Sequence, residues 1–434
     1  MLEPLIRICV IKEKRPSLYY NSVSLVGEGL EGPLLTLFIV GTIAILFLGV
    51  GVVAKTIHRL KIKNFKSIDS LEINGLAPFS VFAGPNGSGK SNFFDALSFV
   101  STFIVSGIEL ALRAHGGYDN IRSAKLLPDS PHTFSLEISC ALSNLLLKKS
   151  VAVVDYSLSI HDLDSTPTIE ESLSIDGNEW LARKGKEIIT MKLLGRENTP
   201  FNIASGNHSA LPFFLIPSLT TLLSNIRLYR IDPLGAAAPS LSDQDPSLLD
   251  RKGRNLARVL NRMERNEDLR ETILDLMQMI VPGIEGIQTA KQEIDSSTAI
   301  LFKEAGTARR FPAHMVSDGT VYALSLLVAV LDAKEDDGII LIEEPERGLH
   351  PKAIQALIDL IRDKATPNRP IWLTTHSESV VRRLRLEELV LVDKQDGRTV
   401  MKSCDSGNIT LDSLAPLGLD EAWLSNLLNG GVPW

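Results

Sequence analysis

The sequence predicts an α/β protein in which a parallel β-sheet and its covering helices are split by a long inserted region. Three observations carry this prediction. A strand pattern at residues 79–83 runs into the glycine-rich segment GPNGSGKS and then into a helical pattern. Much later, the four apolar residues Ile339–Ile342 precede a pair of glutamates. Between residues 317 and 376, helix and strand patterns alternate, which is the order typical of a parallel sheet covered by helices.

The composition is typical of a folded protein with two or three domains. The chain has 434 residues, of which 44% are hydrophobic and 22% are charged, and its formal net charge is -7. These values exclude a disordered chain and a protein that binds nucleic acid through its overall charge. The three cysteines lie far apart and form no CxxC pair. The sequence therefore predicts no zinc site or disulfide framework, and a reducing cytosol is the expected compartment.

The first element is an uncharged apolar run at residues 32–54, which follows an N-terminal tail at residues 1–31. As a helix the run would be about 35 Å long, enough to cross a bilayer core. Basic residues follow it, so we expect a transmembrane helix that anchors the remaining chain on the cytoplasmic side of the inner membrane. Two alternatives stay open: a secretory signal, and a true start near Lys55 that would leave a soluble cytoplasmic protein.

A first lobe is predicted at residues 55–130. Alternating apolar residues indicate two short strands within residues 57–73, and a third strand follows at residues 79–83. The segment from Asn92 to Val105 has its apolar residues on one face, which predicts a helix directly after the glycine-rich loop.

The remaining chain is predicted to hold an inserted α+β region, residues 131–310, and a second lobe, residues 311–434. Within the insertion, residues 133–175 are typical of antiparallel strands, and residues 251–280 are typical of one or two amphipathic helices. The second lobe contains the alternating helices and strands and closes with a hairpin at residues 389–404.

The glycine-rich segment matches the pattern GxxxxGKS in full. Its glycines allow backbone N–H groups to surround a phosphate, and the following helix directs its positive N-terminal end toward the same anion. We expect Lys90 to reach the β- and γ-phosphates of ATP and the Ser91 hydroxyl to hold Mg²⁺. The predicted nucleotide-binding residues here are Gly84, Pro85, Asn86, Gly87, Ser88, Gly89, Lys90, Ser91 and Asn92.

Two carboxylates follow the buried strand at Ile339–Ile342. Ligands bind at the carboxyl ends of strands in open α/β sheets, which is where Glu343 and Glu344 stand. We expect Glu343 to hold the metal through water and Glu344 to polarise the attacking water. The chemistry predicted for this pair is therefore hydrolysis of the bound nucleotide.

Two further segments complete the predicted site. Ser317 is a good helix cap, and Gly319 lets the backbone approach an anion, so Ser317, Asp318 and Gly319 are predicted to contact nucleotide. His376 follows a strand and is expected to contact a γ-phosphate. The alternatives are an ordinary helix cap for Ser317 and a structural role for His376.

The order and the residues of these motifs resemble those of ABC-type ATPases of the RecF/SMC-like branch, a group often labelled AAA family ATPases. LKIKNFKSI before the loop, SDGT as signature, IEEPERGLHP as Walker B with D-loop, and TTHS as switch loop carry the resemblance across residues 57–405. It implies a P-loop NTPase fold of the ABC/SMC head type and hydrolysis of ATP to ADP and phosphate with Mg²⁺. The implied catalytic residues are Lys90, Glu344 and His376.

The resemblance also implies an assembly and one departure. In this branch the signature of one subunit completes the ATP site of the other, so one P-loop and one signature per chain imply a head-to-tail homodimer that binds two ATP molecules. ABC proteins also keep a loop glutamine that senses metal and water. The first glutamine of this chain is Gln244, far beyond the P-loop helix, which leaves open how closure is signalled and which residue replaces the glutamine.

Two functions follow from these patterns. The first is a nucleotide-gated switch in DNA repair and maintenance or in phage defence, with duplex DNA and an effector protein as candidate partners. The alternative is the ATPase subunit of a membrane transport or export machine, although transporter ATPases carry an LSGGQ signature and this chain has SDGT. Arginines with helical spacing are interpreted either as a solvated face or as a phosphate-binding stripe. They are Arg251, Arg254, Arg258, Arg262 and Arg265.

Overall fold

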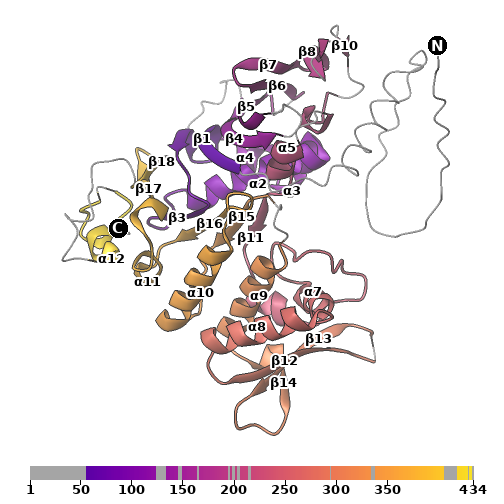
Figure 1. Cartoon of the computed structure of the whole chain (residues 1–434), viewed down its shortest axis with the longest axis vertical. Coiled ribbons are helices and arrows are strands. Elements are labelled where there is room, and N and C mark those ends of the chain that lie inside the picture. The colour runs from indigo at the N-terminus through magenta and orange to yellow at the C-terminus, as the bar shows by residue number, and fades with distance from the viewer. Residues whose placement is uncertain are drawn as a thin grey trace, which may run out of the picture. The chain divides into compact units, whose positions relative to one another are not determined.

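The computed structural model describes most of the chain from residue 55 onward (Figure 1). The described residues are 55–123, 133–144, 149–163, 166–193, 196–197, 201–202, 206–213, 217–293, 295–333, 338–404, 418–428 and 430–432. The transmembrane helix predicted at residues 32–54 and the tail before it lie outside these ranges. Within them, no helix combines the length and the apolar character that a bilayer crossing needs.

A six-stranded sheet forms the centre of the fold, in the order β11-β15-β16-β3-β17-β18. The pairings from β11 to β17 are parallel, and β18 pairs with β17 in antiparallel fashion. Every residue of β3 and β16 is buried, as expected for parallel strands covered on both faces. The strands are β3 (Phe79–Ala83), β11 (Arg227–Tyr229), β15 (Ile340–Glu343), β16 (Ile371–Thr375), β17 (Leu389–Gln395) and β18 (Arg398–Ser403).

Alternate side chains of this sheet enter two different hydrophobic cores. Phe82 and Trp372 pack with residues of the helix after the P-loop and of an antiparallel sheet. Val81 and Leu373 pack with the helices of the second lobe on the other face. Figure 1 accordingly shows β3, β15 and β16 between the antiparallel sheet and those helices. The helices that flank the central sheet are α2 (Lys90–Ser106), α9 (Asp318–Leu331) and α10 (Pro351–Lys364).

The antiparallel sheet joins the first two described strands to strands of the region predicted as an insertion. Its order is β10-β8-β7-β6-β5-β4-β1-β2, and β9 pairs with β8. Buried and half-buried residues alternate along β6, because one face of the sheet is covered. The strands are β1 (Lys55–Phe65), β2 (Ile68–Asn74), β4 (Phe134–Asn144), β5 (Lys149–His161), β6 (Thr168–Ile175), β7 (Asn178–Lys184), β8 (Glu187–Leu193), β9 (Arg196–Glu197) and β10 (Phe201–Asn202).

A small three-stranded sheet and several helices complete the described fold. Residues 131–310 contribute strands to all three sheets, since β11 belongs to the central sheet and β12-β13 to the small one. The domain division made from the sequence stays a prediction. The small sheet contains β12 (Ile284–Lys291), β13 (Thr298–Glu304) and β14 (Arg310–Pro312). The remaining helices are α3 (Ile108–Ala114), α4 (Tyr118–Ile121), α5 (Pro217–Ser224), α6 (Pro233–Ala237), α7 (Leu256–Met263), α8 (Glu267–Ile280), α11 (Glu378–Val381) and α12 (Leu419–Leu424).

The arginine stripe predicted on one helical face is wrong at its start. Arg251 and Arg254 precede α7, because Gly253 takes a left-handed φ of 78° and the buried Asn255 side chain holds the preceding loop in a turn. Arg251 contacts Asp95 on α2, and Arg262 bonds to Asp332 and to the carbonyl oxygen of Pro246. These side chains serve contacts within the chain, so the stripe is not a continuous phosphate-binding surface.

Candidate functional site

The P-loop follows the carboxyl end of β3 and requires glycine at specific positions. Gly87 and Gly89 have φ values of 78° and 106°, a region that other residues adopt only with strain. A Cβ atom added at Gly84 would lie 2.0 Å from the carbonyl oxygen of Val392, and one at Gly89 would lie 1.9 Å from Thr399 Oγ1. The glycines therefore let β17 and β18 pack directly behind the loop.

A chain of short hydrogen bonds fixes the loop from behind. Thr399 Oγ1 donates to the carbonyl oxygen of Ser88 over 2.9 Å, and it lies 2.7 Å from Ser67 Oγ. Asn92, predicted as a nucleotide-binding residue, donates its amide to the same Ser67 hydroxyl over 2.7 Å. In the structure, this side chain ties the first turn of α2 to the turn between β1 and β2.

The loop presents two buried polar groups that suit an anion. Lys90 is buried, and its Nζ donates to the carbonyl oxygens of Gly84 and Pro85, each at 2.8 Å. Burial lowers the pKa of Lys90, and the carboxylates of the strand end oppose that change. Ser88 Oγ is buried without a hydrogen-bond partner among the described residues. A phosphate in the loop would offer acceptors to both groups, so the residues present fit ATP.

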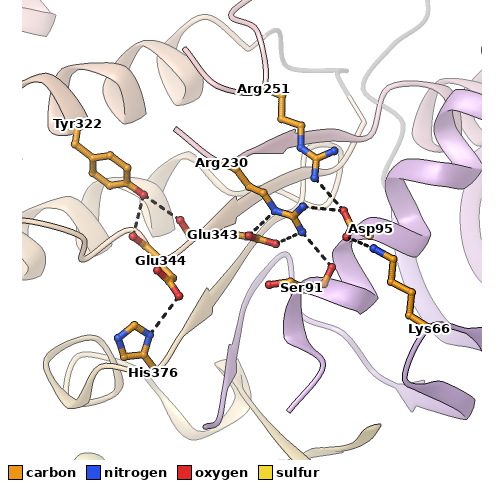
Figure 2. Close-up of polar contacts among 9 residues, drawn as sticks. All are labelled: Lys66, Ser91, Asp95, Arg230, Arg251, Tyr322, Glu343, Glu344 and His376. Atoms are coloured by element: carbon orange, nitrogen blue, oxygen red, sulfur yellow. Dashed lines mark hydrogen bonds and ion pairs between the residues drawn. The ribbon is translucent and has the colours of Figure 1, made fainter. Parts of the chain in front are cut away.

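Glu343, the predicted metal ligand, is held by an arginine that the sequence reasoning missed (Figure 2). Arg230 binds both of its carboxylate oxygens, with Nε 2.5 Å from Oε2 and Nη2 2.6 Å from Oε1. Nη2 of Arg230 also lies 3.3 Å from the carbonyl oxygen of Ser91. The guanidinium thus bridges the Walker B strand and the start of the P-loop helix, between the two residues predicted to hold Mg²⁺.

Asp95 is the second acceptor of this cluster and lies on α2. Its side chain is only 8% exposed and contacts three cations: Lys66 at 2.7 Å, Arg251 at 2.9 Å and Arg230 at 3.0 Å. Burial alone would raise the pKa of Asp95, but the surrounding cations hold it below the ordinary value. Figure 2 shows Arg230 between Asp95 and Glu343, in contact with both. Asp95 therefore stays ionised, and it gives Arg230 a second carboxylate partner besides Glu343.

The position of Arg230 follows from strand order. It comes directly after β11, and β11 pairs in parallel with β15, so the two strands end at the same edge of the sheet. Arg230 therefore reaches Glu343, the predicted metal ligand. The one local signal is the segment RLYRIDP, a short apolar strand followed by arginine and proline.

Glu344 has a backbone conformation that is rare for its residue type. Its φ is 50°, and holding a non-glycine residue there costs about 1–2 kcal/mol. Its N–H donates to the carbonyl oxygen of Thr374 over 3.0 Å, and the Tyr322 hydroxyl donates to the Glu344 carbonyl oxygen over 2.8 Å. Burial raises the pKa of Tyr322, so its hydroxyl remains a donor. The fold thus imposes this turn and directs the carboxylate toward His376 (Figure 2).

His376 lies between two carboxylates. Its Nδ1 is 3.5 Å from Glu344 Oε1 and 3.9 Å from Glu346 Oε1, and both His376 and Glu344 are about two-fifths exposed. Glu346 is buried and accepts from the Thr375 hydroxyl over 2.7 Å, while its Oε2 has no partner among the described residues. Burial raises the pKa of Glu346. The predicted catalytic pair Glu344 and His376 is therefore brought together in one chain.

The predicted signature residues lie at the start of α9. Ser317 caps this helix, since its Oγ accepts from the Thr320 N–H over 3.2 Å. A Cβ atom at Gly319 would lie 2.3 Å from the carbonyl oxygen of Gly348, so the signature packs on the D-loop through glycine. In the part of the chain that the structure describes, no hydrogen bond or ion pair joins residues 317–319 to the P-loop of the same chain.

The donor set fits a metal ion that arrives with a nucleotide. Mg²⁺ in phosphate sites usually takes one or two carboxylates together with phosphate oxygens and water. Ser91 and Glu343 supply a hydroxyl and a carboxylate on either side of Arg230. Across the described residues there is no group of three His, Cys, Asp or Glu side chains that could hold a metal ion by itself.

Comparison with protein families finds two matches. Residues 192–382 match a family described as "AAA domain, putative AbiEii toxin, Type IV TA system". Residues 59–110 match a second family, described as "AAA domain". Together the two segments contain most of β1, the P-loop, the signature and the Walker B strand.

Individual relatives include a nucleotide phosphatase and Smc proteins. A Helicobacter pylori protein called ATP/GTP phosphatase is 22% identical over 335 residues, which is 75% of this chain and 86% of that protein. The chromosome partition protein Smc of Methanocaldococcus jannaschii is 47% identical over 45 residues, 10% of this chain and 4% of that protein. A solved Smc head bound to the C-winged helix domain of ScpA superposes with a TM-score of 0.52 at 15% identity. The superposition covers 82% of this chain and 99% of the Smc head, and it shows a shared fold.

Proposed function

We propose that this AAA-type ATPase, which has the fold of an SMC head, is a switch that closes as a head-to-tail dimer on ATP and reopens after hydrolysis. The observation that carries the proposal is the separation of the two halves of the site. The P-loop and Walker B carboxylates meet at one edge of the sheet, whereas residues 317–319 pack on the D-loop of their own chain. A second copy would bring its signature to the first copy's nucleotide.

Each residue of the site has a separate task in this proposal. Lys90 and the loop N–H groups bind the phosphates. Ser91 and Glu343 hold Mg²⁺, which neutralises charge on the phosphate oxygens when bound. Glu344 orients and polarises the attacking water. His376 lies 3.5 Å from the Glu344 carboxylate and can exchange protons with it.

The test is Glu344→Gln, measured as ATP turnover and as oligomeric state by light scattering. Only the carboxylate that activates water is lost, so we expect a 10²–10⁴-fold lower turnover with ATP binding retained, the usual range for removing a catalytic base. Because hydrolysis no longer reopens the dimer, the variant should accumulate as an ATP-bound dimer.

Two results would count against the proposal. If the variant kept a turnover above about a tenth of wild type, Glu344 would not be the residue that activates water. If the variant stayed monomeric at saturating ATP, the proposed ATP-dependent dimer would be contradicted. Lys90→Ala serves as the matched control, because it should lose ATP binding itself and therefore stay monomeric with ATP present.

For the biological role, we favour phage defence over DNA repair and maintenance. The support is the description of the family matched at residues 192–382, which names a putative AbiEii toxin and a toxin–antitoxin system. An effector protein is then the expected partner, and the solved Smc head with its bound ScpA domain is a precedent for partner binding on this fold. Duplex DNA stays a candidate ligand, to be tested by ATPase rate with and without DNA.

The membrane anchor predicted at residues 32–54 stays a prediction and underlies the alternative role in transport or export. If the anchor is present, full-length protein should sediment with membranes and resist carbonate extraction. Recovery of the full-length protein in the supernatant would contradict both the anchor and the transport alternative. The ATPase proposal is independent of this result, because every phosphate-binding motif lies after Lys55.

A further inference from the structure

We propose that Arg230 competes with Mg²⁺ for Glu343, so that release of this carboxylate by Arg230 favours formation of the metal site. The inference rests on the proposed ATPase function and deepens it, since it assigns the control of metal binding to one residue. It also names the residue that takes the place of the missing loop glutamine.

The geometry places Arg230 and Mg²⁺ in competition for Glu343. Arg230 occupies both carboxylate oxygens through Nε and Nη2, at 2.5 and 2.6 Å. A carboxylate bound in this bidentate way has its best lone pairs directed at the guanidinium, not at a cation or its water shell. Each oxygen keeps a second lone pair, but a cation placed there would lie beside the guanidinium charge. Breaking at least one of these hydrogen bonds therefore favours binding of Mg²⁺ to Glu343, directly or through water.

The surroundings make the pair exchangeable. The Arg230 side chain is 29% exposed and the Glu343 side chain 13%, so water can take over contacts that are lost. Asp95 already accepts from Nη1 of Arg230 at 3.0 Å and remains as its partner when Glu343 is released. Arg230 would thus keep one ion pair, and its charge would stay beside the P-loop helix, where Nη2 already reaches the Ser91 carbonyl oxygen.

The charges predict how the exchange affects nucleotide binding. Without Mg²⁺, the Arg230 cation offsets the repulsion between Glu343 and the phosphates. With Mg²⁺, the metal does so, and Arg230 opposes it by holding Glu343. Arg230 should therefore strengthen binding of metal-free nucleotide and weaken the advantage that Mg²⁺ adds.

The experiment measures the dissociation constant of a fluorescent, non-hydrolysable ATP analogue in excess EDTA and in excess Mg²⁺. The ratio of the two constants is the Mg²⁺ advantage, and it does not depend on catalytic turnover. In Arg230→Met we expect this ratio to rise about tenfold, from the lower range for a hydrogen bond to a charged group. Arg230→Lys keeps the charge without the fork, so an intermediate ratio is expected.

Two controls separate this effect from a general loss of charge. Arg251→Met removes a neighbouring cation that contacts Asp95 and not Glu343, so its ratio should stay within about twofold of wild type. In a Glu343→Gln background the competing carboxylate is absent, and adding Arg230→Met should then change the ratio by less than about twofold. Melting temperatures of all variants verify that they are folded.

The outcomes are distinct from those of the ATPase proposal. An unchanged ratio in both Arg230→Met and Arg230→Lys overturns the competition. An equal rise in Arg251→Met also overturns it, because the effect would then come from the overall field. A wild-type protein that binds no ATP analogue would instead contradict the proposed function itself.

Discussion

Two arginine–glutamate pairs in this molecule each join neighbouring strands, but their surroundings differ greatly. Arg183 and Glu171 join β7 to β6 at 2.7 Å with both side chains fully buried. Every oxygen of Glu171 is satisfied, with Tyr156 donating to Oε1 and the Ala210 N–H to Oε2, each at 2.7 Å. Arg230 and Glu343 join β11 to β15 at the edge of the central sheet, where both are partly exposed.

The difference shows which pair can take part in function. Among the described residues Arg183 has no second carboxylate partner, and its other nitrogens donate to the carbonyl oxygens of Gly185 and Gly206. Such a sealed pair fixes the structure, since breaking it leaves a buried charge with no solvent to compensate. Arg230 keeps Asp95 as an alternative partner and is open to water. We therefore interpret the first pair as structural and the second as a switch.

The largest expected effect separates the two pairs by stability. Arg183→Met should lower the free energy of unfolding by about 3–5 kcal/mol, because it leaves Glu171 charged, buried and unpaired. Arg230→Met should lower it by less than Arg183→Met does, because water partly reaches Glu343 and because Lys66 and Arg251 remain beside Asp95. Urea unfolding monitored by circular dichroism measures both values.

A double variant controls for the loss of side-chain packing. Glu171→Met combined with Arg183→Met removes both charges and should recover part of the loss. Recovery stays partial because the Tyr156 hydroxyl and the Ala210 N–H lose their acceptor. Equal losses in Arg183→Met and Arg230→Met would show that the two pairs do not differ in the way proposed.

A smaller effect is expected from Asp95→Asn, which removes the alternative partner of Arg230. Lys66, Arg230 and Arg251 would then share one carboxylate fewer in a mostly buried position. We expect a loss of about 2 kcal/mol in stability and a lower Mg²⁺ advantage in nucleotide binding, because Arg230 would bind Glu343 alone.

The matched control is Asp359→Asn, whose side chain is 37% exposed and pairs with Arg383. Because water screens this pair, its loss of stability should stay below about 1 kcal/mol, with no change in the Mg²⁺ advantage. A higher Mg²⁺ advantage in Asp95→Asn would contradict the role of Asp95 as the second partner of Arg230.

The smallest effect concerns Glu346, which is buried but only half satisfied. Burial raises its pKa in the folded protein above the unfolded value of about 4.3. Its contribution to stability is therefore complete below pH 4.3 and is lost as the pH rises through the folded pKa. Glu346→Gln cannot ionise, so it should gain about 1–2 °C in melting temperature over wild type at pH 7 and none at pH 4. A pH-independent difference would contradict this assignment.

The central sheet and most residues of the candidate nucleotide site can be predicted from the sequence alone. Buried runs such as Ile339–Ile342 predict parallel strands, and the carboxyl ends of such strands meet at one edge. For that reason Glu344 and His376, at the ends of β15 and β16, could be predicted to lie together, and they do. The P-loop was also predictable, because its glycines and its lysine are adjacent in sequence.

The partners of these residues depend on the tertiary structure and could not be predicted. Arg230 and Glu343 are 113 residues apart, and β11, which positions Arg230, has three residues, too few for a periodic pattern. The same limit explains the arginine stripe: spacing alone predicted one helix, whereas Gly253 and Asn255 form a turn before it. Long-range pairing depends on strand order, and strand order depends on how two cores close around one sheet.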